Sequence, residues 1–238
     1  MSLVGAAGGN MNKRLAVGMI TIGQSPRDDI VPEIKQLTGI NFEIAECGVL
    51  DGLSRSEIER LAPEPGEYML VSKLSDGSTV RLARSKIVEN VQRCINSLVG
   101  RGVDFTVILC SGEWPKFSSS KLVVAPGEAF CGFTLGMVNE GDKLGIMIPD
   151  EDQVEVAKRR WNKEKVKLRI AVASPFGLTA NDEVARAAKS LEQSGVDLVA
   201  MDCVGYTMEK KRIVQEITGK PVVLVRSVIA NIIREVAG

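Results

Sequence analysis

GVDFTVILC at residues 102–110 and GVDLVAMDC at residues 195–203 follow one pattern: Gly-Val-Asp, five residues, then a cysteine. Each copy comes after a helix-like stretch that ends in glycine, and each cysteine closes an apolar run typical of a buried strand. The repeat predicts a duplicated unit of helix, tight turn, parallel strand and loop. Ligands of open α/β sheets bind at the carboxyl ends of the strands, so we expect Cys110 and Cys203 to face one shared site from two related halves.

The composition favours a small-molecule partner. The chain has 238 residues, with 30 basic and 30 acidic side chains and no long run of either sign, which argues against nucleic acid and a membrane surface. No apolar stretch approaches the roughly 20 residues of a membrane-spanning helix, and the amino terminus lacks a signal-peptide pattern, so we expect a cytoplasmic protein. The Gly-rich opening is interpreted as a flexible leader or cloning remnant over residues 1–14.

The chain has five cysteines and no histidine. The odd number in a chain of this size favours reduced thiols over a disulfide framework. Without histidine or a CxxC pair, the usual zinc and iron sites are excluded and no metal is expected. Histidine-activated nucleophiles are excluded for the same reason, so proton transfer must use Cys, Asp, Glu, Lys or Tyr. Cys47, Cys94 and Cys131 have no matching partner, and Cys94 lies in a helical apolar pattern typical of a core residue.

Strand-like and helix-like segments alternate along the rest of the chain. A strand at residues 15–22 is followed by a helix at residues 26–37, which starts on a Ser-Pro signal. Residues 68–82 form two alternating arms around Ser-Asp-Gly-Ser, which predicts an inserted β-hairpin. The expected fold class is α/β, with two pseudo-symmetric lobes, each a mostly parallel sheet flanked by helices. The expected lobes are residues 15–138 plus 226–238 at the amino-terminal side and residues 139–225 at the carboxyl-terminal side.

The matched cysteines can supply the base that a histidine-free site needs. A thiol between a strand end and a helix start is near backbone N–H groups and the positive end of a helix dipole, which lower its pKa. If Cys110 and Cys203 faced one substrate carbon, one as thiolate and one as thiol, they could remove a proton from one face and return one on the other. The alternative is that each is a small apolar residue at a strand end. Asp202 is expected to point to the opposite side of its strand from Cys203.

The loops after the strands offer groups that could bind an anion. GQSPR at residues 23–27 combines a glycine, amide and hydroxyl donors, backbone N–H groups at a helix start and an arginine. It could equally be a capped helix start with a solvated arginine. The segment is neither GxGxxG nor a Walker loop, so nucleotide binding is not indicated. The candidate substrate-binding residues are Gln24, Ser25, Arg27, Ser111, Gly112, Glu113, Ser174, Gly205, Tyr206 and Thr207.

Four segments carry a family resemblance: TIGQSPR at residues 21–27, LDGLS at residues 50–54, LAPEPGEYML at residues 61–70 and MDCVGYT at residues 201–207. Together they resemble the AroM protein family. The resemblance implies a fold like that of the aspartate/glutamate racemase superfamily, in which each of two pseudo-symmetric lobes carries a catalytic cysteine, here Cys110 and Cys203. It also implies chemistry without a cofactor. The loops differ from the superfamily's usual pattern, because Ser-Gly-Glu follows Cys110 in place of Asn-Thr, and Val-Gly-Tyr follows Cys203 in place of Thr-His.

Three functional hypotheses follow. The first is a cofactor-independent racemase- or isomerase-like enzyme for a small carboxylate or other anion, with both cysteines as acid/base or nucleophile. The second is a decarboxylase or isomerase that depends on a single cysteine. The third is a small-molecule binding or sensor protein that kept the site without turnover, because a fold shared with enzymes does not establish function. No nucleic acid or membrane is expected as a partner, and a homodimer is an option because two-lobed enzymes of this size often pair.

Overall fold

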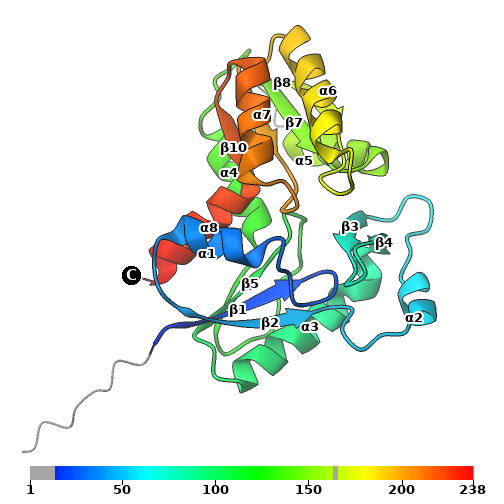
Figure 1. Cartoon of the computed structure of the whole chain (residues 1–238), viewed down its shortest axis with the longest axis vertical. Helices are drawn as coiled ribbons and strands as arrows, with labels where there is room; N and C mark the ends of the chain where they lie inside the picture. The colour runs from blue at the N-terminus through cyan, green and yellow to red at the C-terminus, as the bar shows by residue number, and fades with distance from the viewer. Residues whose placement is uncertain (1–13, 163–165, 238) are drawn as a thin grey trace, which may run out of the picture.

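The computed structural model describes residues 14–162 and 166–237. Apart from residue 14, the leader expected at residues 1–14 lies outside the described residues. Within the described ranges the chain forms two four-stranded sheets and one two-stranded sheet, with helices against both larger sheets (Figure 1). The expected α/β class is confirmed.

The first sheet has the strand order β2-β1-β5-β6, and all of its strand pairs are parallel. Its strands are β1 (Ala16–Thr21), β2 (Glu43–Gly48), β5 (Phe105–Ile108) and β6 (Leu122–Val124). The helices of this half are α1 (Val31–Thr38), α2 (Arg55–Glu59), α3 (Arg84–Gly100) and α4 (Pro126–Leu135). α3 packs against β1, β2 and β5 and buries an apolar face that includes Ile87, Val91 and Leu98.

The second sheet has the order β10-β9-β7-β8 and is also parallel. Its strands are β7 (Lys143–Ile148), β8 (Lys167–Val172), β9 (Leu198–Met201) and β10 (Val222–Leu224). The helices of this half are η1 (Glu151–Gln153), α5 (Val154–Trp161), α6 (Ala180–Gln193) and α7 (Met208–Thr218), and α8 (Val225–Ala237) follows β10. Written as β8-β7-β9-β10, the order matches that of the first sheet, so β5 and β9 are equivalent strands.

The Gly-Val-Asp repeat has one structural role in both sheets. Gly102 and Gly195 have φ angles of 82° and 66°, a left-handed conformation that glycine adopts without steric cost, and they turn the chain out of α3 and α6. The carboxylates of Asp104 and Asp197 then each accept a hydrogen bond of 2.9 Å from the first N–H of the central strand, β1 or β7. The repeat therefore fixes the alignment of β5 on β1 and of β9 on β7. Both cysteines leave their sheets at equivalent points as a result.

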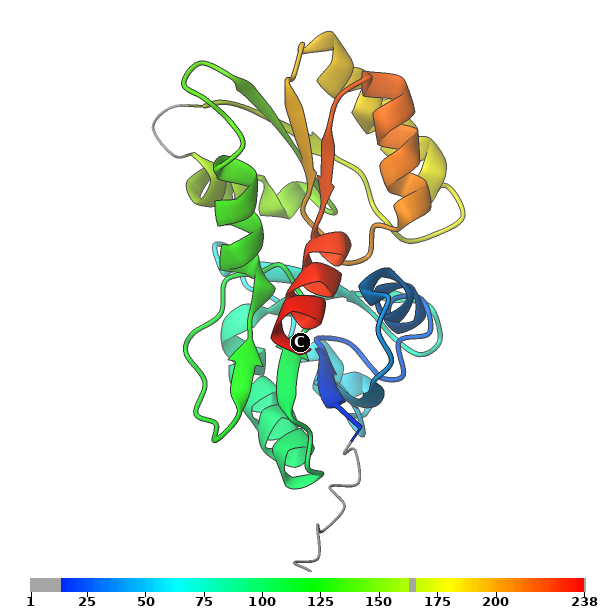
Figure 2. The ribbon, with the colours of Figure 1, turned by 90° about the vertical axis from the view of Figure 1, so that its left-hand side faces the viewer.

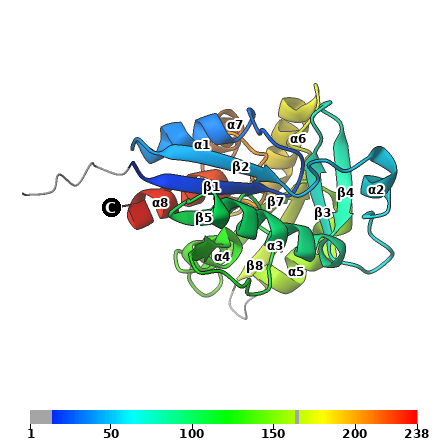
Figure 3. The ribbon, with the colours of Figure 1, turned by 90° about the horizontal axis from the view of Figure 1, so that it is seen from below.

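α8 and the small hairpin lie on different sides of the region between the two sheets (Figures 1 and 3). α8 leaves β10 in the second sheet and packs against α1 and α4 of the first half, as Figure 2 shows in red. The hairpin consists of β3 (Met69–Lys73) and β4 (Thr79–Ala83), which pair antiparallel. The hairpin predicted at residues 68–82 is thereby confirmed.

The helix expected at residues 26–37 begins later than predicted. α1 starts at Val31, because the carbonyl of Arg27 accepts hydrogen bonds from the N–H groups of Ile30 and Val31 and closes a turn first. The Ser-Pro signal therefore marks the loop rather than the helix, and the backbone N–H groups of residues 23–27 do not stand at a helix start.

Cys47 and Cys94 form a disulfide, so the expectation that all the thiols are reduced is wrong. Cys47 lies on β2 and Cys94 on α3, with their Cα atoms 5.6 Å apart. Cys94 is buried as its apolar pattern predicted, but the pattern did not indicate its partner, which the packing of α3 on β2 supplies. Across the parts of the chain that the structure describes, no helix is both long and apolar enough to cross a membrane.

Candidate active site

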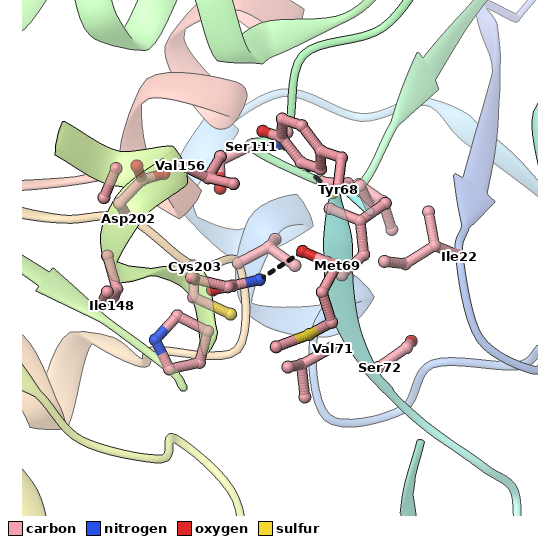
Figure 4. Close-up of a pocket in the computed structure, with 18 of the residues that line it drawn as sticks. Ile22, Tyr68, Met69, Val71, Ser72, Ser111, Ile148, Val156, Asp202 and Cys203 are labelled. Carbon is pink, nitrogen blue, oxygen red and sulfur yellow. Dashed lines mark hydrogen bonds between the residues drawn. The ribbon is translucent and has the colours of Figure 1, made fainter. Parts of the chain in front are cut away.

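Cys110 and Cys203 line one pocket, to which both halves of the chain contribute. Figure 4 shows Cys203 at this pocket, with Tyr68 of the first half and Ile148 of the second half. Cys110 follows β5 and Cys203 follows β9, so each stands beyond the carboxyl end of the strand that the repeat predicted. Both residues are buried, at 7% and 8% exposure. The cavity has a volume of about 50 Å³, enough for a few water molecules. The structure thus brings the two matched cysteines into one small site.

The backbone turns that hold the two sulfurs are alike. The N–H of Gly112 donates to the Cys110 sulfur at 3.3 Å, and the N–H of Gly205 donates to the Cys203 sulfur at 3.4 Å. In both loops the donor is a glycine two residues after the cysteine. A thiolate is the stronger acceptor, so each turn favours the charged form of its sulfur.

Burial nevertheless raises the pKa of Cys110 to about 11 and that of Cys203 to about 12. Removal from water disfavours a thiolate, and the hydrogen bond from a single N–H group does not compensate for this effect. The expected lowering of both pKa values is therefore wrong. No helix start follows either cysteine directly, because a long loop connects Cys110 to β6, and α7 begins only at Met208.

A buried ion pair stands beside the thiols. Arg160 and Asp202 both line the pocket and are each 8% exposed. Their side chains meet at 3.1 Å between Nη1 and Oδ2, and Trp161 donates its indole N–H to the same carboxylate oxygen at 2.7 Å. Asp202 was expected to point away from Cys203, but β9 ends at Met201, so strand alternation does not extend to this residue. Its carboxylate connects the Cys203 loop to α5.

A second buried arginine enters the pocket from the loop after β1. Arg27, one of the candidate binding residues, is 5% exposed and lines the pocket. Its guanidinium forms two hydrogen bonds with the carboxylate of Asp29, at 2.8 and 3.0 Å, and a third with the hydroxyl of Thr21 at 3.0 Å. The side chain is thus held in a fixed orientation toward the site.

Each of the two pocket arginines acts on the cysteine that comes from the other half of the chain. Arg160, from the second half, is among the charges that oppose the effect of burial on the pKa of Cys110, and Arg27, from the first half, does the same for Cys203. A guanidinium carries five N–H groups, more than the partners described above use, so Arg27 and Arg160 can each donate to a bound carboxylate. Arg160 was not among the residues predicted from the sequence, because its helix is distant in sequence from both cysteines.

Only part of the predicted set of binding residues lines the pocket. Besides Arg27, Ser111 and Gly112 do so. The pocket lining does not include Gln24, Ser25, Glu113, Ser174, Gly205, Tyr206 and Thr207.

Most of these seven residues hold the surrounding loops in place. Gln24 accepts hydrogen bonds from Ser75 in the hairpin turn, and Ser25 is bound to Asp51. Thr207 caps α7. The other contacts are local too: Ser174 with Phe176 and Glu183, the Tyr206 hydroxyl with the carbonyl of Ala173, and the backbone of Glu113 with Tyr68 and Arg84.

The hairpin covers the pocket and bridges the two halves. Residues 68–72, which include all but the last residue of β3, line the cavity. The Gln153 side chain donates to the carbonyl of Met69 at 3.0 Å, drawn as a dashed line in Figure 4. On β4, Arg81 forms ion pairs with Asp150 at 2.9 Å and Asp152 at 3.0 Å, both beyond the end of β7. These contacts attach the hairpin of the first half, which acts as a lid over the pocket, to the second half.

Arg81→Gln is expected to increase the alkylation rate of both pocket thiols about fivefold. Exposed ion pairs contribute roughly 0.2–1 kcal/mol each. The loss of two would therefore raise the fraction of molecules in which the hairpin is open about fivefold. Iodoacetamide labelling, measured at each cysteine by mass spectrometry, tests this. Arg93→Gln, an exposed arginine of α3 bonded to Asn90, is the matched control. Equal rates in wild type and Arg81→Gln would show that the ion pairs do not hold the hairpin closed.

The geometry agrees with a comparison against known families. The family model described as "AroM protein" matches residues 17–237. The chain belongs to the AroM family. The match includes both cysteines, both pocket arginines and the hairpin, and it confirms the resemblance seen in the four sequence segments. No curated protein matches the sequence of this AroM protein.

Solved structures share the fold of this AroM protein at low identity. Glutamate racemase from Francisella tularensis subsp. tularensis SCHU S4, in complex with D-glutamate, has a TM-score of 0.60 at 11% identity, over 94% of this chain and 81% of that one. Picrophilus torridus aspartate racemase has a TM-score of 0.54 at 14% identity, over 94% of both chains. Unliganded arylmalonate decarboxylase has a TM-score of 0.55 at 13% identity, over 94% and 93%. The AroM protein therefore has an aspartate/glutamate racemase-like fold.

Proposed function

We propose that this AroM protein is a cofactor-independent, racemase- or isomerase-like enzyme that acts on a small carboxylate through Cys110 and Cys203. One observation carries the proposal: two thiols from equivalent positions of the two sheets line a single pocket. A lone buried cysteine is more often a packing residue, but a matched pair at one cavity fits acid/base chemistry on the two faces of a carbon.

The reaction needs one thiolate and one thiol. The thiolate takes the proton next to the substrate carboxylate and becomes a thiol, while the opposite thiol gives its proton to the other face of the carbanion and becomes a thiolate. The total charge of the pair is unchanged. Arg27 and Arg160 supply N–H groups that can hold the carboxylate and stabilise the charge that develops on it.

The substrate has to enter beneath the hairpin. The cavity of about 50 Å³ is too small for a substrate of amino-acid size, since ligand pockets usually have several hundred Å³. The lid contacts of Arg81 and Gln153 must therefore open for binding and can close again over the bound molecule. A small carboxylate fits this arrangement better than a large ligand.

The structural neighbours give the first substrates to try. They include a glutamate racemase, an aspartate racemase and an arylmalonate decarboxylase. Each of these names describes a reaction in which a group on the carbon next to a carboxylate is removed or replaced. We therefore choose a panel of amino dicarboxylates, 2-hydroxy acids and aryl-substituted malonates.

The test is hydrogen exchange with solvent at the carbon beside the carboxylate. Each panel acid is incubated in deuterated water with wild type, Cys110→Ser or Cys203→Ser, and deuterium incorporation and any loss of carboxylate are followed by NMR. We expect exchange with at least one acid, reduced by about 100- to 10,000-fold in either variant, the usual contribution of a general acid or base. Cys131→Ser, a buried thiol outside the pocket lining, is the matched control.

Other outcomes separate the rival functions. Dependence on one cysteine alone, with loss of a carboxylate, supports a single-cysteine decarboxylase. Binding of a panel acid without exchange supports a binding or sensor protein, which the raised pKa values of both thiols favour. Exchange that survives in both variants contradicts cysteine chemistry altogether.

A further inference from the structure

We infer that Arg226 is a positioning residue for Cys203. Its guanidinium holds the carbonyl side of the peptide group whose N–H faces the Cys203 sulfur, and it attaches this turn to the loop that carries Arg27. The part that Arg226 plays in catalysis rests on the proposed function, whereas the arrangement itself belongs to the folded chain and can be tested without a substrate.

The first observation is a buried guanidinium bonded to the Cys203 turn. Arg226 is the second residue of α8 and is only 1% exposed. Its Nε and Nη2 atoms donate to the carbonyl of Val204 at 3.0 and 2.8 Å, and Nη2 also donates to the carbonyl of Gly205 at 3.4 Å. A guanidinium stays charged when it is buried, so these are charge-assisted hydrogen bonds. One edge of Arg226 therefore holds two consecutive carbonyls of the turn.

The second observation is that the Val204 carbonyl and the Gly205 N–H belong to one peptide group. This bond is trans, since Ser25–Pro26 is the only cis bond among the described residues. The C=O and N–H of a trans peptide group point to opposite sides. Arg226 binds the C=O side, and on the other side the N–H donates to the Cys203 sulfur at 3.4 Å. The cation thus fixes the direction of this N–H and, by polarising the peptide group, strengthens it as a donor.

The other edge of the guanidinium reaches the first half of the chain. Nη1 of Arg226 donates to the carbonyl of Asp29 at 3.1 Å and forms an ion pair with Glu33 of α1. The carboxylate of Asp29 is the group that orients Arg27 toward the pocket. The turn that holds the Cys203 sulfur and the loop that carries Arg27 therefore have one common support, although they come from different halves.

The turn at Cys110 has the same N–H donor but no arginine behind it. Its donor, the N–H of Gly112, shares a peptide group with the carbonyl of Ser111. Within the described parts of the chain, no side chain donates to that carbonyl, and the nearby Arg160 donates to Gly127 and Asp202 instead. A change at Arg226 should therefore act on Cys203, and Cys110 can serve as a reference in the same molecule.

Other ionisable groups also face Cys203, and the test has to leave them in place. Cys110 and Asp202 raise the pKa of Cys203 together with burial, whereas Arg27 lowers it. The buried Tyr206 is close enough for its own pKa to be raised by Cys203. Substitutions at position 226 keep all four of these groups.

Three variants separate the hydrogen bonds of Arg226 from its charge. Arg226→Met removes both and keeps an unbranched apolar side chain. Arg226→Lys keeps the charge near Glu33, but an ammonium lacks the planar fork that donates along two edges. Glu33→Gln is the matched control, because it removes the ion pair of the same joint and leaves the bonds from Arg226 to Val204.

The experiment is the pH profile of iodoacetamide alkylation, given as brief pulses from about pH 8 to about pH 10 and read separately at the two thiols by mass spectrometry. The ratio of the Cys203 rate to the Cys110 rate is compared, because opening of the hairpin affects both thiols and cancels. In Arg226→Met the ratio should fall about tenfold, as expected for the loss of a charge-assisted hydrogen-bond network. It should fall about threefold in Arg226→Lys, where the charge remains, and stay within about twofold of wild type in Glu33→Gln.

Several results would overturn the inference. A wild-type ratio in Arg226→Met or in Arg226→Lys would show that the fork does not support the thiolate, and a higher ratio would show that Arg226 only shields the sulfur. The same fall in Glu33→Gln would assign the effect to the stability of the joint, and a rise of similar size there would assign it to charge alone. If Arg226→Met does not fold, the other two variants decide the matter. An absence of deuterium exchange would refute the proposed function and leave this result intact, because labelling needs no substrate.

Discussion

Asp202→Ala is expected to lower the free energy of unfolding by about 3–5 kcal/mol, the usual cost of removing one partner from a buried ion pair. The substitution leaves the Arg160 guanidinium buried without its counter-charge, and it leaves the Trp161 N–H without an acceptor. Both groups lie on α5, so the helix should lose its attachment to the Cys203 loop. Urea unfolding followed by circular dichroism measures the change.

Two further variants show whether charge is the cause. Asp152→Ala breaks a largely exposed pair with Arg81 and should cost less than about 1 kcal/mol. Arg160→Met combined with Asp202→Leu removes both charges and should recover much of the stability lost in Asp202→Ala, because no unpaired charge then remains buried. If the double variant were as unstable as Asp202→Ala, the loss would come from packing around Trp161 and not from an uncompensated arginine.

The features predicted correctly from sequence depend on short-range patterns. The Gly-Val-Asp repeat contains its own turn, strand and sheet-edge position within nine residues, so the placement of Cys110 and Cys203 followed from local rules. The hairpin at residues 68–82 was recognisable for the same reason, since its turn and its alternating arms are adjacent in sequence.

The features that were missed depend on packing between distant segments. Arg160 reaches the pocket only because α5 packs beside β7, and Cys47 meets Cys94 only because α3 covers β2. The direction of the thiol pKa shifts was predicted wrongly for a related reason. Local N–H donors can be anticipated from a loop, whereas the loss of water around a sulfur depends on the hairpin that closes over it.

The two thiols are also expected to make the protein less stable in alkali, by roughly 5 kcal/mol between about pH 9 and about pH 11. The ordinary thiol pKa is 9.0, and burial raises it to about 11 at Cys110 and to about 12 at Cys203. Above about pH 9 the unfolded chain has released these protons while the folded chain still holds them. The stabilising contribution is thus complete below about pH 9 and is lost as the pH rises toward the folded values, by about 1.4 kcal/mol per pH unit for each thiol.

Urea unfolding at a series of pH values measures this loss, and the single variants Cys110→Ser and Cys203→Ser should each remove about half of it. Tyr68 and Tyr206 also have a pKa raised by burial, but they affect all three proteins alike, so the difference between the curves isolates the thiols. Parallel curves would mean that the thiols ionise as readily in the folded chain as in the unfolded chain. The pocket would then be filled with water in solution, and the hairpin would not be the barrier that raises the pKa of both sulfurs.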